Sequence, residues 1–167
     1  GICASTTKAM TAVCIGMLVD EGRLHWTDKV RDVLPGFSLY DPYVSAELTV
    51  RDLLTHSAGL GNTNNLWIYG YSADEIVRRM RLAPPAYPFH TSFIYQNCMY
   101  IVAGELIRRV SGLSWEDFIT RRLFGELGMR HTYPPYSRMR GESSLEGLHV
   151  MADDSIRVIP RIDYSGV

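Results

Sequence analysis

The chain has 167 residues, which is the size of one ordinary domain. Apolar residues make up 46% and charged residues 21% of the composition, so we expect a packed core and exclude a disordered chain. Seventeen basic and eighteen acidic side chains leave a net charge of −1, without the basic excess that a nucleic-acid partner requires. The longest apolar run, residues 12–19, is too short for a membrane span of about 20 residues.

Three cysteines, Cys3, Cys14 and Cys98, are an odd number and stand in no metal-binding spacing. We therefore expect buried, reduced thiols and neither a disulfide framework nor a metal centre. The chain opens without an initiator methionine or a signal peptide and runs straight into a helical pattern. This start suggests a processed chain or a fragment, and it leaves the cellular compartment open.

Periodicity and capping residues predict several helices, separated by loops rich in Gly, Asn and Pro. The first helix is apolar nearly all round, which predicts a central, buried element. Ser72 and Glu75 are expected to form a capping box for another. The expected helices are residues 5–21 ending at Gly22, residues 28–34, a helix from a cap at Thr49 to near Gly59, and residues 72–82, 98–110 and 114–124.

The helical pattern breaks down beyond Met129, and residues 130–167 are expected to be irregular. Within them, residues 149–151 and 156–159 could pair as a short hairpin across Asp153-Asp154. No internal repeat or low-complexity stretch is visible. We therefore expect residues 1–167 to form a single, mainly α-helical domain with little strand.

Ser5 and Lys8 stand three residues apart at the start of the first helix, so the ammonium should lie beside the hydroxyl. The helix N-terminus favours negative charge at Ser5, and a lysine among apolar neighbours can assist removal of the hydroxyl proton. Lys8 is one of two lysines against fifteen arginines, which supports a special role. The alternative is that Ser5 only caps the helix while Lys8 extends to the surface.

A second short motif, Tyr-Gln-Asn, occupies residues 95–97 ahead of a predicted helix. A tyrosine near a protonated lysine can lose its proton well below its usual pKa of about 10, which suits Tyr95 to act as a general base. Asn97 could cap the helix and bind a substrate at once. In the alternative interpretation, Tyr95 packs in the core and Asn97 only caps the helix.

Two further features admit a functional interpretation. His56 could be a catalytic base, but no Gly-x-Ser-x-Gly elbow accompanies it, so we favour a structural histidine that bonds the loop after its helix. Trp67, Tyr69 and Tyr71 on the loop of residues 59–71 could line a substrate cleft, although such aromatic residues more often serve packing.

Several blocks of the sequence are together similar to the serine β-lactamase and penicillin-binding-protein superfamily, in the branch of class C β-lactamases, DD-peptidases and esterases. The blocks follow the family's order and cover roughly residues 2–132. They are residues 5–12, 18–24, 48–60, 95–97 and 123–129. The family's third motif, Lys-Thr-Gly or His-x-Gly on a strand, is not found in this chain. The resemblance therefore implies the helical portion of the β-lactamase/transpeptidase-like α+β fold, with most of its antiparallel sheet missing.

The resemblance also implies a covalent mechanism through an acyl-Ser5 intermediate. Lys8 would help to deprotonate Ser5, whose backbone N–H would be one oxyanion-hole donor, and Tyr95 would pass the proton to the leaving group. Asn97 would bind polar groups of the substrate. Gln96, at a position that is often Ser in the family, would tune the pocket. The substrate would be a small-molecule ester, β-lactam or peptide amide, and no metal or organic cofactor is implied.

The missing third motif keeps a second interpretation open, namely a non-catalytic fragment or pseudo-enzyme that binds a ligand or a partner. A helical layer that should cover a sheet would also expose a large apolar face. We therefore expect the chain to self-associate through that face.

Overall fold

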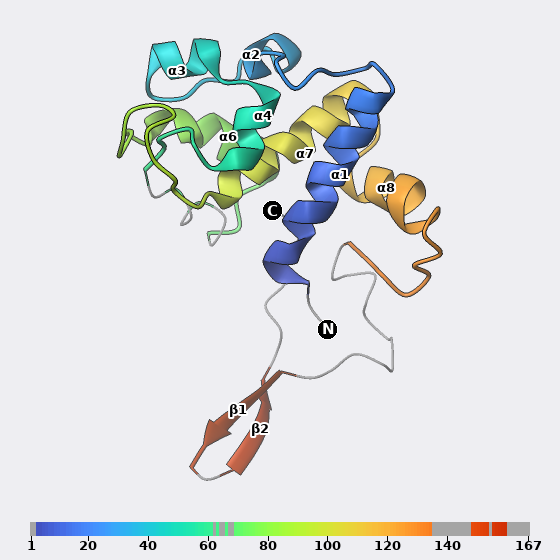
Figure 1. The fold of residues 1–167 in the computed structure, drawn as a ribbon. Coiled ribbons are helices and arrows are strands. Elements are labelled where there is room, and N and C mark those ends of the chain that lie inside the picture. The colour runs from blue at the N-terminus through green and yellow to red at the C-terminus, as the bar shows by residue number, and fades with distance from the viewer. Residues whose placement is uncertain are drawn as a thin grey trace.

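The computed structural model describes residues 3–61, 63, 66, 69–134, 148–153 and 155–159. These residues form a mainly helical body and one antiparallel hairpin, which lies apart from the helices in Figure 1. The helical elements are η1 (Ala4–Thr6), α1 (Thr7–Asp20), α2 (Val30–Val33), α3 (Pro42–Glu47), α4 (Val50–Thr55), α6 (Ala73–Arg79), η2 (Met80–Leu82), α7 (Asn97–Ser111), α8 (Trp115–Ile119) and η3 (Thr120–Phe124).

The hairpin consists of β1 (Leu148–Ala152) and β2 (Ser155–Ile159), where the sequence predicted a pair of strands. Its register places Leu148 opposite Ile159 and Ala152 opposite Ser155. The remainder of the C-terminal segment that was predicted to be irregular, residues 135–147, 154 and 160–167, lies outside the described residues.

The helical body is built around α7, which packs against α1, α4, α6 and α8 (Figure 1). Its buried side chains recur at helical spacing and form one apolar face, while Arg108 and Arg109 are exposed. The helix ends at Gly112, whose φ of +76° is a left-handed conformation that glycine adopts without strain. The buried residues of this face are Cys98, Met99, Val102, Ala103, Leu106 and Ile107.

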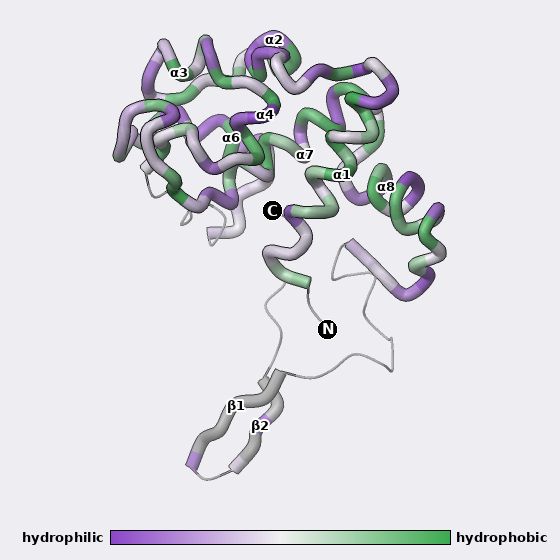
Figure 2. Tube along the Cα trace, in the orientation of Figure 1, coloured by the Kyte–Doolittle hydropathy of each residue, from purple (hydrophilic) through white to green (hydrophobic). Residues whose placement is uncertain are grey.

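Only one face of α1 is buried, so the prediction of a helix buried all round was wrong. Thr11, Cys14, Ile15 and Leu18 are buried, whereas Val13 keeps 47% of its surface exposed. The apolar residues do continue around the helix, as Figure 2 shows, but its packing partners α7, α8 and η3 leave the other face uncovered. None of the described helices is long and apolar enough to cross a membrane.

The thiols also divide in a way that the sequence did not predict. Cys14 and Cys98 are free and buried as expected, and burial raises the pKa of Cys14 to about 11. Cys3, in contrast, is exposed, because it precedes η1 and lies outside the packed helices.

Capping explains where the short helices begin and corrects two expectations. The unpredicted helix α3 begins after Asp41, whose carboxylate accepts hydrogen bonds from two backbone N–H groups, with Pro42 in the first position. Ser72 accepts from the backbone N–H of Glu75, but the Glu75 carboxylate pairs with arginines of its own helix instead of completing a capping box.

The helix α4 ends earlier than predicted. It begins with a reciprocal capping box between Thr49 and Asp52, and it stops at Thr55 because His56 adopts a left-handed conformation with a φ of +59°. The sequence placed this end near Gly59. A left-handed histidine is uncommon, so nothing in the sequence marked it as the stop.

The segment after α4 runs beside the segment that leads to Tyr95. The carbonyl of Gly59 accepts hydrogen bonds from the backbone N–H groups of Ala86 (2.9 Å) and Tyr87 (3.3 Å). Farther along, the backbone N–H of His90 donates to the carbonyl of Ser57 at 2.9 Å. This pairing fixes the path of the chain toward residues 95–97.

Gly59→Ala is expected to destabilise the fold more than Gly70→Ala does. Both glycines have φ near +70°, so alanine costs about 1–2 kcal/mol of backbone strain at either position. At Gly59 a Cβ would also stand 2.3 Å from the carbonyl oxygen of Tyr87, whereas Gly70 has open space. We expect an additional loss of about 1–3 kcal/mol at Gly59, measured as free energy of unfolding in urea. Equal losses in the two variants would contradict this account.

Candidate active site

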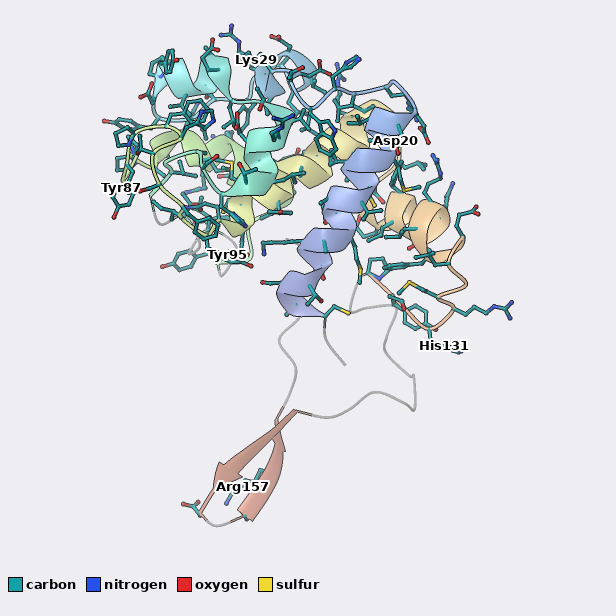
Figure 3. The ribbon with its side chains drawn as sticks, in the orientation of Figure 1. Asp20, Lys29, Tyr87, Tyr95, His131 and Arg157 are labelled. Carbon is teal, nitrogen blue, oxygen red and sulfur yellow. The ribbon has the colours of Figure 1, made fainter. Side chains whose placement is uncertain are left out.

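The four residues that the sequence proposed as a site lie together in the structure. The Ser5 Oγ accepts a hydrogen bond from the Tyr95 hydroxyl at 2.6 Å and another from Lys8 Nζ at 3.3 Å. Lys8 Nζ also donates to Asn97 Oδ1 at 2.5 Å. Figure 3 shows Tyr95 beside the N-terminal part of α1. Residues 90 positions apart in the chain therefore meet at one serine hydroxyl.

Each of these side chains is positioned by a different local structure. Ser5 lies in the 3-10 turn η1, which continues into α1, so Lys8 follows it by about one turn. The residue before the serine, Ala4, has a φ of +45°, a strained conformation of a kind that clusters at functional sites. Tyr95 lies in the irregular segment before α7, and Asn97 is the first residue of α7 and not its cap, which is Gln96.

The ammonium of Lys8 is half-buried between polar and aromatic groups. Besides Ser5 and Asn97, it lies 4.6 Å from the ring centre of Tyr95 and 5.5 Å from that of Tyr100. The other lysine, Lys29, forms a peripheral ion pair with Glu47 at 2.8 Å. Lys8 therefore directs its positive charge toward the two phenols.

The pKa values of the two tyrosines near Lys8 shift in opposite directions. Burial alone raises the pKa of Tyr95, but hydrogen bonds with Lys8 and Ser5, together with the Lys8 charge, outweigh it and hold the pKa below its usual value. The pKa of Tyr100 is raised instead, by burial and by the charge of an ionised Tyr95. Its hydroxyl donates to the Leu54 carbonyl at 3.0 Å. Tyr95 is thus the phenol that ionises more readily.

Gln96 points away from the serine and anchors a neighbouring loop. Its side chain is only 1% exposed, and its amide nitrogen donates to the carbonyls of Leu60 (2.9 Å) and Gly61 (2.7 Å). Its amide oxygen accepts from the Thr63 hydroxyl at 2.6 Å. Any influence of Gln96 on the pocket therefore passes through this loop.

Sequence reasoning missed the surroundings of Tyr95. His56, expected to bond the loop after its own helix, instead accepts a hydrogen bond from the backbone N–H of Gln96 through Nδ1, at 3.1 Å. Tyr100 also borders the site. Its position three residues after Asn97 on the same helix could have indicated this, because residues at that spacing share a helix face.

The aromatic loop that was weighed as a cleft wall is only partly described. Trp67 lies outside the described residues. Tyr69 is 71% exposed, and the Tyr71 ring lies 4.2 Å from the guanidinium carbon of Arg79. In the described part of the loop, Tyr71 is therefore engaged with α6.

A serine and a lysine one helical turn apart, with a tyrosine hydroxyl on the serine, define the class of serine β-lactamases and penicillin-binding proteins. A comparison with family models agrees: residues 3–159 match the Beta-lactamase family. The chain belongs to this family, as the sequence motifs suggested.

Individual relatives carry related names. An unguisins hydrolase from Aspergillus violaceofuscus is 36% identical over 139 residues, which cover 77% of this chain and 24% of that protein. Penicillin-binding protein 4 from Amycolatopsis lactamdurans is 31% identical over 131 residues, covering 77% of this chain and 34% of its own length. The octameric penicillin-binding protein homologue from Pyrococcus abyssi superposes with a TM-score of 0.79 and 25% identity, over 96% of this chain and 38% of that one.

The chain thus spans about a quarter to a third of the length of these curated relatives. Hydrolases occur among the relatives of the family.

Proposed function

We propose that this chain carries the acylation site of a serine hydrolase that cleaves an ester, a β-lactam or a peptide amide through an acyl-Ser5 intermediate. One observation carries the proposal: the Ser5 Oγ lies within hydrogen-bond distance of both Tyr95 (2.6 Å) and Lys8 (3.3 Å). A serine hydroxyl becomes a nucleophile only when a neighbouring group accepts its proton. The two groups that could assist, the Tyr95 hydroxyl and the Lys8 amine, both contact Ser5 Oγ.

In the proposed step, the ionised Tyr95 accepts the proton of Ser5 as Oγ attacks the substrate carbonyl. A bond forms between Oγ and the carbonyl carbon, and the bond to the leaving group breaks. The proton then passes from Tyr95 to the departing oxygen or nitrogen, so that the phenolate is restored. Lys8 stabilises the negative charge that moves between the two oxygens.

Asn97 is proposed to act on the lysine as well as on the substrate. Its side-chain oxygen accepts from Lys8 Nζ at 2.5 Å, which orients the ammonium toward Ser5. The side-chain amide nitrogen of Asn97 is a donor by its chemistry, and such a donor suits the carbonyl of a substrate amide.

Labelling of Ser5 by a fluorophosphonate tests the proposal. Attack of Oγ on phosphorus expels fluoride and leaves a stable phosphonyl ester, which intact-protein mass spectrometry detects. We expect one adduct, located on the peptide that contains Ser5 and absent from Ser5→Ala. The matched control is Ser72→Ala, because Ser72 is also an exposed serine at the start of a helix. It should be labelled like the unaltered chain.

The opposite results would favour the non-catalytic alternative. No adduct at high reagent concentration, or the same adduct in Ser5→Ala, would mean that Ser5 is not activated. A penicillin in place of the fluorophosphonate then narrows the substrate class, since an adduct that adds the whole penicillin mass indicates β-lactam opening.

A further inference from the structure

His56 lies at the edge of the proposed site with its side chain almost fully buried. The residue is 8% exposed, and its ring centre lies 4.8 Å from that of Tyr95 and 5.4 Å from that of Tyr100. The Phe93 ring meets it edge-on at 5.3 Å. Three aromatic rings therefore pack around a single imidazole, and one of them is the Tyr95 ring, whose hydroxyl donates to Ser5 Oγ.

The backbone and side chain of His56 hold both neighbours of Tyr95. Its carbonyl accepts from the N–H of Ile94 at 3.0 Å, and its Nδ1 accepts from the N–H of Gln96 at 3.1 Å. Tyr95 stands between these two anchored residues. His56, which has a left-handed φ of +59°, thus presents two acceptors to the segment of residues 94–96.

We propose that His56 is a positioning residue that holds the phenol of Tyr95 against Ser5. The inference rests on the proposed function, because it assigns His56 to the same acyl-transfer site. His56 acts through Tyr95, because its two acceptors anchor the residues on either side of that tyrosine.

The electrostatic surroundings agree with a neutral imidazole. Burial and the positive charge of Lys8 both lower the pKa of His56, and among the described residues the phenol rings of Tyr95 and Tyr100 lie against its ring. A neutral ring with Nδ1 as acceptor must carry its proton on Nε2.

The first test is made on the unaltered 167-residue chain. In ¹⁵N-labelled protein at pH 7, the histidine nitrogen shifts should show His56 as the neutral tautomer with its proton on Nε2. A protonated ring, or a proton on Nδ1, would rule out the hydrogen bond from Gln96 and overturn the proposal.

The second test compares His56→Ala with His56→Asn. Asparagine tolerates the left-handed conformation and places an acceptor oxygen near the position of Nδ1, whereas alanine has no acceptor. We expect His56→Ala to label Ser5 about tenfold to a hundredfold more slowly with fluorophosphonate. His56→Asn should recover most of that loss. Thermal unfolding reports whether each variant is folded.

A spectroscopic readout separates positioning from stability. In protein with ¹³Cζ-labelled tyrosine, with the Tyr95 resonance assigned by its absence from Tyr95→Phe, the pKa of Tyr95 should rise toward about 10 in His56→Ala and less in His56→Asn. An unchanged Tyr95 titration and labelling rate in folded variants would reduce His56 to packing. The Tyr95 titration tests the positioning role of His56 even if Ser5 is never labelled. Absence of labelling would contradict only the proposed function.

Discussion

Lys8→Arg is expected to slow the phosphonylation of Ser5 by about 10²–10⁴-fold while leaving the fold intact. Lys8 Nζ reaches two acceptors, at 3.3 Å from Ser5 Oγ and 2.5 Å from Asn97 Oδ1. An ammonium is a compact charge that fits between them, whereas a guanidinium is planar, larger and always protonated. Arginine would therefore keep the positive charge but could not occupy the same point between the two acceptors.

The chain supplies a matched control, because Lys29 is its other lysine. Lys29 Nζ donates to the Glu47 carboxylate at 2.8 Å and to its carbonyl at 3.0 Å, with no contact to Ser5. Lys29→Arg should label at the rate of the unaltered chain and change stability by less than about 1 kcal/mol. The rate is measured as adduct formation against time. If both arginine variants label equally fast, Lys8 is not part of the activation of Ser5.

The predicted pair Ser5 and Lys8 came directly from sequence because its geometry is local. Two residues separated by three positions on a helix must lie on the same side, whatever surrounds that helix. The positions of Tyr95 and Asn97 could not be predicted in this way, because their spacing in the sequence does not show that they lie beside α1. The family resemblance placed them in the site, where Tyr95 bonds Ser5 and Asn97 bonds Lys8 through tertiary contacts.

His56 shows why the rest of the site escaped prediction. Its partner is a backbone N–H, a group that every residue except proline carries, so no residue type at position 96 could have indicated the bond. Its left-handed backbone also has no sequence signal, whereas the left-handed residue after α7 is Gly112, the residue type typical of a helix C-terminus. Burial of α1 was misjudged for a related reason: a helix that is apolar all round does not reveal which face its neighbours cover.

Tyr95→Phe is expected to have an effect as large as that of Lys8→Arg. The substitution keeps the ring that packs on His56 and removes only the hydroxyl at 2.6 Å from Ser5 Oγ. Loss of a general base typically costs about 10²–10⁴-fold in rate. The matched control is Tyr100→Phe, which removes a hydroxyl bonded to the Leu54 carbonyl and should change the labelling rate little.

The pH dependence of labelling distinguishes a base from a mere packing group. The phenolate is the form that accepts a proton, so the rate should rise with pH and level off above the pKa of Tyr95. Hydrogen bonds with Lys8 and Ser5 and the Lys8 charge outweigh burial and lower that pKa, so the rise should be centred below the usual value of about 10. Tyr95→Phe should lose the rise, and Tyr100→Phe should keep it. A profile of Tyr95→Phe that still climbs with the same midpoint would assign the base to another group.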